Sequence, residues 1–254
     1  MPGHSERQRL REAELANQRA ARLRRIILVG SAVLAVVLIA VMAVVVTQRS
    51  QQAGAPAASG SAGVPYPPNA TAGKDGIVVN ANPGKPVVGL YFDYQCGPCR
   101  QFDQSFGTAL DLLGQTHEIE FVHHTRVFLD KGSAEGLSHR AALAAACSDV
   151  VGAYRPYAAA IWEAASQGPY TDRLFLDTIP AKVGITDADL TAFRSCYANG
   201  NLAPFVQQVE DLALKAGLTE TPVLTVNGKR ITSSQLQGKT GDDLRQVILD
   251  AAKS

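Results

Sequence analysis

A pair of cysteines two residues apart, Cys96-Gly97-Pro98-Cys99, constrains the fold of this chain more than any other feature. The pair follows an apolar run inside Pro86–Tyr94 that predicts a strand, and it precedes Arg100–Leu113, which predicts a helix. Glu118–Thr125 alternates apolar and polar residues, as the next strand would. The sequence therefore predicts a β-α-β unit with both cysteines at the turn between strand and helix.

Two thiols one helical turn apart, at the start of a helix, are suited to disulfide exchange. Cys96 is expected in the first turn, where unpaired N–H groups and the positive end of the helix dipole stabilise a thiolate. Cys99 faces the same side and can attack a mixed disulfide formed at Cys96. Pro98 fits an early helical position, because no N–H partner is needed there. We therefore predict a redox centre at Cys96 and Cys99, with Cys96 as the accessible, attacking thiol.

A zinc site or a plain structural disulfide is the alternative use of this cysteine pair. A tetrahedral zinc ion needs further ligands, and His123 and His124 are the only suitable candidates. Adjacent strand residues point to opposite faces of a sheet, so these two side chains cannot easily bind one ion. We expect no metal and no cofactor, with one histidine buried and the other exposed.

The chain becomes helical from about residue 133 to residue 217. The segment Thr186-Asp187-Ala188-Asp189 resembles a capping box that opens a helix, which Asn199-Gly200 would close. Ala- and Leu-rich segments with helical spacing predict three more helices, at Ser138–Val151, Ala158–Ser166 and Pro204–Ala216.

The two ends of the domain supply its remaining elements. Ile77–Asn80 is a short strand candidate ahead of the cysteine strand. Val223–Val226 and Lys229–Thr232 flank Asn227-Gly228, which predicts a hairpin with a type I′ turn, and Thr240–Ala252 predicts a final helix. The order β-α-β, helices, β-β-α predicts an α/β thioredoxin fold with an inserted α-helical domain.

The N-terminal quarter of the chain predicts a membrane anchor. Residues 1–25 are polar and Arg-rich, and Ile26–Val46 runs for 21 residues without a charge. As a helix, this run would be about as long as the hydrocarbon core of a bilayer is thick. The positive-inside rule places residues 1–25 in the cytoplasm and the rest of the chain outside, across the cell membrane. A cleaved signal peptide is the alternative, but its apolar region is normally shorter.

Composition separates the anchor from the domain. Residues 47–75 are rich in Gln, Ala, Gly, Ser and Pro, which predicts a flexible linker, so the domain is expected to span residues 76–254. Residues 1–50 hold eight of the 24 basic and three of the 23 acidic side chains, which leaves 16 basic and 20 acidic for the remainder. The domain therefore has no basic surplus of the kind that binds nucleic acid.

The residues around the cysteine pair resemble a known family. Cys-Gly-Pro-Cys is the motif of thioredoxins, and Phe92-Asp93-Tyr94-Gln95 before it resembles the exported DsbA-like branch, particularly membrane-tethered bacterial members. The resemblance covers residues 76–254. It implies a cis-proline beside the active site, which matches Thr221-Pro222, where a substrate segment could pair as an added strand. An ordinary trans turn proline is the alternative.

Two positions depart from the thioredoxin pattern. Thioredoxins carry a buried acid six residues before the first cysteine, where this chain has Leu90, and a Trp directly before it, where this chain has Gln95. Asp93 is nearer to the cysteines but is expected toward the rim, so we assign no acid–base residue.

Cys147 and Cys196 lie on two different predicted helices of the insertion. Exported proteins keep paired cysteines oxidised, so we expect a structural disulfide between them, as in the DsbA-like proteins of some bacteria. A second redox pair is the alternative.

The resemblance implies an enzyme, a protein-disulfide oxidoreductase. Its expected reaction donates the Cys96–Cys99 disulfide to unfolded exported proteins with free thiols, and a quinone-linked membrane partner would re-oxidise it. A reductase or isomerase is the alternative, because Gly-Pro is the dipeptide of reducing thioredoxins and the dipeptide helps to set the potential. A redox-inert module that binds extended peptides is the third possibility.

Overall fold

The computed structural model describes residues 65–253 except 132, 134, 166 and 167. The predicted cytoplasmic segment 1–25, the predicted transmembrane helix Ile26–Val46 and most of the predicted linker 47–75 lie outside these residues. Within the described part, no helix is both long enough and apolar enough to cross a bilayer.

A five-stranded sheet forms the centre of the fold, with the order β1-β3-β2-β4-β5. Strand β2 runs parallel to β3 and antiparallel to β4, so the strand that leads to the cysteines is the central one. Its residues Val88, Leu90 and Phe92 are buried. The strands are β1 (Ile77–Asn80), β2 (Val87–Phe92), β3 (Glu120–Thr125), β4 (Val223–Val226) and β5 (Lys229–Ile231).

The helix after the cysteines begins at Gly97, so Pro98 takes the early helical position expected of it, but the helix is not uniform. It starts as α2 (Gly97–Phe102), passes through a π-helical turn, η1 (Asp103–Gly107), and continues as α3 (Thr108–Gln115). The short α9 (Ser233–Leu236) and the final helix α10 (Gly241–Lys253) follow β5, and α10 packs on α3 and β4. The α/β thioredoxin fold predicted from the sequence is confirmed for the described residues.

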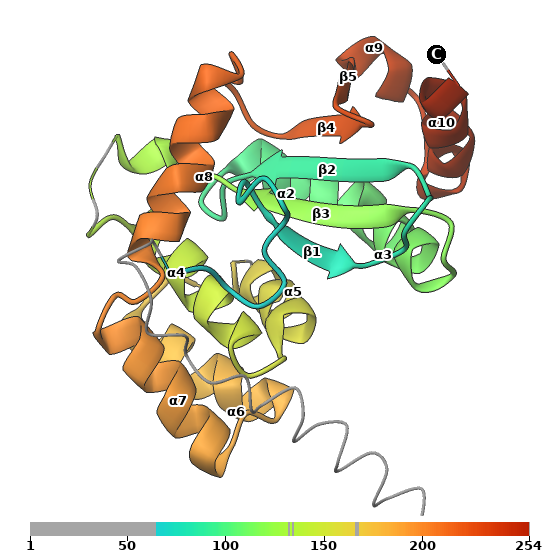
Figure 1. The fold of residues 1–254 in the computed structure, drawn as a ribbon. Coiled ribbons are helices and arrows are strands. Elements are labelled where there is room, and N and C mark those ends of the chain that lie inside the picture. Colours follow the sequence, from blue (N-terminus) through green and yellow to red (C-terminus); the bar gives the residue numbers. More distant parts are fainter. Residues whose placement is uncertain (1–64, 132, 134, 166–167, 254) are drawn as a thin grey trace, which may run out of the picture. The chain divides into compact units, whose positions relative to one another are not determined.

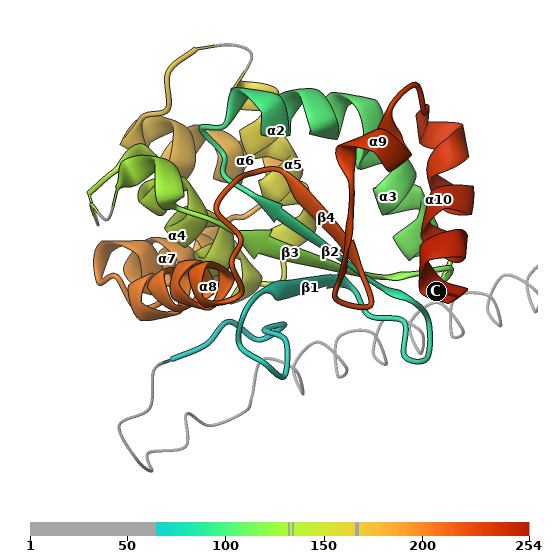
Figure 2. The same cartoon turned by 90° about the horizontal axis from the view of Figure 1, so that it is seen from above.

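The predicted helical insertion is present and lies at one end of the sheet, while α3 and α10 lie at the other (Figures 1 and 2). Helix α4 is central to it, because it packs against α5, α7 and α8 and is buried along nearly its whole length. The elements are η2 (Phe128–Asp130), α4 (Leu137–Asp149), α5 (Tyr154–Ala164), η3 (Leu174–Thr178), α6 (Ile179–Val183), α7 (Asp187–Ala198) and α8 (Ala203–Lys215).

Two local predictions for the insertion need correction. The helix at Asp187–Ala198 forms, but the predicted capping box does not, because the Thr186 side chain makes no capping hydrogen bond. The segment Leu174–Val183 lies in the region predicted to be helical, but no separate helix was assigned to it, and it forms a π-helical turn followed by α6. Buried Phe175 and Ile179 anchor this segment, so its conformation depends on packing more than on local periodicity.

A buried ion pair joins the insertion to the sheet. Arg126, directly after β3, donates two hydrogen bonds of 2.7 Å to the carboxylate of Glu210 on α8. The backbone N–H of Val127 donates a third to the same carboxylate, at 3.0 Å. Arg126 also donates from Nη1 to the carbonyl of Leu218, 3.0 Å away, at the start of the segment that leads to Thr221-Pro222. Such a pair is stable when buried only because nearly every donor and acceptor is matched.

His123 and His124 point to different surroundings, and neither is exposed. The Nδ1 atom of His123 lies 3.1 Å from the Tyr154 hydroxyl. The Nδ1 atom of His124 lies 2.6 Å from the carbonyl oxygen of Asp75, and its ring stacks on Tyr91 at 4.0 Å. The prediction that one histidine is exposed is wrong, because both faces of the sheet are covered at β3.

The folded part begins before the predicted boundary at Gly76. Asn69 donates from its backbone N–H and its side-chain amide to the two carboxylate oxygens of buried Asp149, at 2.7 Å each. Tyr66 packs edge-on against Phe205 of α8. Residues 65–75 therefore belong to the folded unit, and the predicted linker is shorter at this end.

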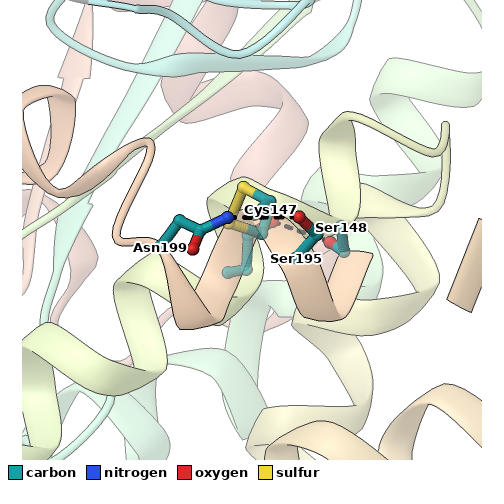
Figure 3. The surroundings of a disulfide bond; sticks show 6 residues. Cys147, Ser148, Ser195 and Asn199 are labelled. Atoms are coloured by element: carbon teal, nitrogen blue, oxygen red, sulfur yellow. Dashed lines mark hydrogen bonds between the residues drawn. A yellow bond between two sulfur atoms is a disulfide. The ribbon is translucent and has the colours of Figure 1, made fainter. Parts of the chain in front are cut away.

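A disulfide joins Cys147 on α4 to Cys196 on α7 (Figure 3). The two cysteines are 49 residues apart in sequence, and both are buried, with 0% and 4% of their surface exposed. The bond therefore ties two helices of the insertion together and offers a substrate little access to either sulfur.

Replacement of both cysteines, Cys147→Ser with Cys196→Ser, is expected to destabilise the insertion. Loss of a cross-link across a loop of this size costs roughly 4 kcal/mol in the chain-entropy model, so thermal unfolding should begin at a clearly lower temperature. Thiol exchange at Cys96 should stay within about twofold at temperatures where the variant is folded. A folded variant that loses exchange would instead indicate a redox relay between the two cysteine pairs.

Candidate active site

Cys96 lies at the N-terminal end of α2, as a direct consequence of how β2 ends. After Phe92 the chain turns, and the N–H of Cys96 donates to the carbonyl of Asp93 at 3.0 Å. The Sγ atom of Cys96 then accepts a hydrogen bond from the backbone N–H of Cys99 at 3.2 Å. Cys96 is therefore the N-cap residue of the helix, with its sulfur in the place that a capping oxygen usually takes.

The two thiols of this pair are held in different states. Cys96 and Cys99 are not bonded to each other in the structure, and 7% of Cys96 but 2% of Cys99 is exposed. A hydrogen bond from the Cys99 thiol, together with the Cys99 N–H, lowers the pKa of Cys96 to about 6. The same interaction and burial raise the pKa of Cys99. At neutral pH the reduced site therefore holds a thiolate at Cys96 and a protonated thiol at Cys99.

The structure brings Thr221 and Pro222 beside this pair. The Thr221–Pro222 peptide bond is cis, and the carbonyl oxygen of Thr221 lies 3.6 Å from the Sγ atom of Cys96. Of the six site residues predicted from the sequence, four thus meet at one place, whereas Cys147 and Cys196 form the separate disulfide of the insertion.

Contrary to the prediction from the sequence, Asp93 does not lie toward the rim of the site. It is fully buried, not at the rim, because the insertion covers the loop before Cys96. Its carboxylate accepts hydrogen bonds from the N–H of Gln95 (2.8 Å), the hydroxyl of Ser138 (2.6 Å) and the N–H of Leu129 (3.2 Å). Burial raises the pKa of Asp93, while these bonds oppose the rise. All three partners act as donors, so the ionised form fits the site.

A second carboxylate completes the junction between the active-site loop and the insertion. Asp130 accepts from the side-chain amide of Gln95 (2.9 Å) and from the backbone N–H groups of Ser138 (3.2 Å) and His139 (2.7 Å), in the first turn of α4. Gly136 permits this approach, because a Cβ there would lie 2.0 Å from the Asp130 carboxyl carbon. Gln95, next to Cys96, is thereby fixed to the N-terminus of α4.

No local signal in the sequence identifies this junction. The partners Asp93 and Ser138 are 45 residues apart, and an Asp near a strand end is equally typical of an exposed turn. Leu90, at the position where thioredoxins carry an acid, is buried and apolar. The carboxylate closest in sequence to the cysteines thus enters from the loop and not from the strand.

The family follows from a match along most of the domain. Residues 74–248 match the family model described as Thioredoxin. The chain belongs to the thioredoxin family. No curated protein sequence matches it.

Solved structures with the same fold share little sequence with this thioredoxin-family chain. The MdbA protein of Corynebacterium diphtheriae, described as a thiol-disulfide oxidoreductase, has a TM-score of 0.58 at 19% identity and covers 78% of this chain and 99% of its own. MdbA of Actinomyces oris has a TM-score of 0.57 at 18% identity, covering 67% and 82%. DsbA of Mycobacterium tuberculosis has a TM-score of 0.51 at 22% identity, covering 70% and 98%. At these identities the likeness establishes the fold.

The charge of Asp93 is expected to hold the pKa of Cys96 higher than it would otherwise be. The ionised carboxylate disfavours a second negative charge nearby. In Asp93→Asn, the midpoint of Cys96 alkylation against pH should fall by roughly half a unit. Ser138→Ala is the matched control, since it removes a donor of the same network but keeps the charge, and its midpoint should not move. Equal midpoints in Asp93→Asn and the wild type would show that the carboxylate does not act on Cys96.

Proposed function

We propose that this chain is an exported thiol–disulfide oxidoreductase that introduces disulfides into secreted or cell-envelope proteins through Cys96 and Cys99. The observation that carries the proposal is the asymmetry of the pair, a stabilised thiolate at Cys96 beside a protonated, more deeply buried thiol at Cys99. Three similar structures, two MdbA proteins and a DsbA, carry names of this class of enzyme and support it.

The reaction is a two-electron exchange that needs no cofactor. In the oxidised form, a substrate thiolate attacks the Sγ atom of Cys96, the Cys96–Cys99 bond breaks, and Cys99 leaves and takes up a proton. A second substrate thiolate then attacks the substrate sulfur of the mixed disulfide. A substrate disulfide forms, and Cys96 leaves as a thiolate. Because Cys96 has a low pKa, it is a good leaving group in this last step.

The Thr221 carbonyl is suited to align the substrate. A segment in extended conformation can pair with the backbone before β4 as an added strand. The 3.6 Å separation between that carbonyl and the Cys96 sulfur would bring the substrate cysteine to the reacting atom. Recognition through backbone groups also fits an enzyme that accepts many unfolded proteins.

A stabilised thiolate at Cys96 is a property that an oxidase requires. A site that stabilises its reduced form is a stronger oxidant. The Cys96 pKa of about 6 lies between values of ~7 for thioredoxin and ~3.5 for DsbA. A reductase or isomerase remains the second candidate, favoured by Gly97-Pro98. A redox-inert peptide-binding module would leave the thiolate at Cys96 without a use.

The location that we propose rests on the sequence. Residues 1–25 would be cytoplasmic, Ile26–Val46 would anchor the chain in the cell membrane, and the linker would hold the catalytic domain outside. A membrane partner linked to quinones would re-oxidise the Cys96–Cys99 pair. The substrates would be unfolded exported proteins with free cysteine thiols.

The test combines a potential with a trapping experiment. The reduction potential of the Cys96–Cys99 pair, from equilibration with glutathione, should lie well above the thioredoxin value of about −270 mV. The oxidised protein should form disulfides in a reduced, unfolded substrate protein. Cys99→Ser should accumulate mixed disulfides, each linked through Cys96. Cys96→Ser is the matched control and should trap none.

Two results would overturn parts of the proposal. A potential near the thioredoxin value would make the reductase reading the better one. Mixed disulfides that form equally well on Cys99 in the Cys96→Ser variant would exclude Cys96 as the attacking thiol.

A further inference from the structure

A hollow of about 240 Å³ borders Cys96 between the start of α2 and residues 168–170. Sites for drug-sized ligands are usually ~300–1,000 Å³ in volume, so this hollow suits one side chain of a larger ligand better than a small molecule. Its wall includes Leu137, Pro169 and Tyr170, which offer apolar surface. The Tyr170 hydroxyl is occupied, because it donates to the carbonyl of Tyr94 at 3.1 Å.

Arg100 supplies the charge in this hollow. It lies on α2, four residues after Cys96 and therefore on the same helix face. One guanidinium nitrogen, Nη1, donates to the carbonyl of Ala165 at 2.8 Å, which holds the side chain toward the hollow. The other N–H groups of the Arg100 guanidinium have no acceptor within the described part of the chain.

This lack of an acidic partner sets Arg100 apart. Among the described residues, no carboxylate lies within ion-pair distance of Arg100, and exposed Arg173 is the other arginine of which this is true. The remaining arginines all pair with a carboxylate: Arg126, Arg140, Arg155, Arg194, Arg230 and Arg245. A fixed guanidinium beside the reacting sulfur, whose remaining donors meet no acceptor among the described residues, is suited to a carboxylate from outside.

We propose that the hollow is a specificity subsite, in which Arg100 binds an acidic side chain of the substrate polypeptide within two positions of its reacting cysteine. This inference rests on the proposed function and adds a preference to it. In an extended segment, side chains one or two residues from the cysteine lie within ~7 Å of it, so they reach a hollow that borders Cys96. The apolar wall accommodates the stem of a Glu, and the guanidinium binds its carboxylate.

The test uses three reduced peptides that differ only beside their single cysteine, with Glu, Gln or Lys at the flanking positions. Their rates of attack on the oxidised protein are measured at low salt and divided by the rates of the same peptides with a small symmetrical disulfide. This division removes the effect of the flanking charge on the peptide thiol itself. The Glu peptide should react roughly three- to tenfold faster than the Lys peptide, and the preference should shrink at high salt.

Charge reversal identifies the residue responsible. Arg100→Glu should reverse the preference in favour of the Lys peptide, and Arg100→Gln should abolish it. Arg173→Gln is the matched control, because it removes the same charge from an arginine that does not line the hollow, and it should keep the wild-type preference.

The outcomes separate this inference from the proposed function. If the wild type reacts with all three peptides at equal corrected rates, the subsite is refuted while the oxidoreductase activity stands. The same holds if Arg100→Glu keeps the preference for Glu. If the oxidised protein reacts with no peptide at all, the proposed function itself fails.

Discussion

The hydrogen-bonded pairing of Cys99 with the Cys96 sulfur, through its thiol and its backbone N–H, is the contact on which the site depends. It exists because β2 ends at Phe92 and the chain turns directly into α2, so that Cys96 takes the N-cap position. The helix that follows runs on through η1 and α3, and its unpaired N–H groups favour negative charge at this end. Strand β2 is central and pairs with β3 and β4, so the sheet as a whole fixes the position of the Cys96 sulfur.

Two buried polar junctions connect the insertion to this site. The Arg126–Glu210 pair joins β3 to α8 and also binds the segment that leads to Thr221. Asp93 and Asp130 bind the loop before Cys96 to the start of α4. Buried polar groups are costly unless they are satisfied, so each junction permits few alternative arrangements. The insertion therefore sets the surroundings of Cys96 as well as covering one end of the sheet.

The elements with strong local patterns could be predicted from the sequence. The strand before Cys96, the Asn227-Gly228 hairpin and most helices of the insertion depend on short-range periodicity and turn residues. The cysteine motif and Thr221-Pro222 were recognisable because each occupies a fixed place in that order of elements. The disulfide partners Cys147 and Cys196 were the only other cysteines in the chain.

What could not be predicted depends on contacts between distant segments. Asp93 is buried in contact with Ser138, and the hollow at Arg100 is formed with residues 168–170. Neither contact can be inferred from the local spacing of residues. The start of the folded part was placed too late because Asn69 belongs to a Gly- and Pro-rich stretch but binds Asp149, 80 residues away. The prediction of an exposed histidine was wrong for the same reason, because segments distant in sequence cover both faces of β3.

The pKa values of the pair predict a thiolate at Cys96 and a protonated thiol at Cys99 at neutral pH. The most direct test is the ultraviolet absorbance of the thiolate, near 240 nm, followed against pH in the reduced protein and corrected with Cys96→Ser. We expect a single transition near pH 6 that disappears in Cys96→Ser and persists in Cys99→Ser. A first transition at about pH 8.5, the value of an ordinary cysteine, would show that neither the Cys99 thiol nor the N–H at the helix end stabilises the Cys96 thiolate.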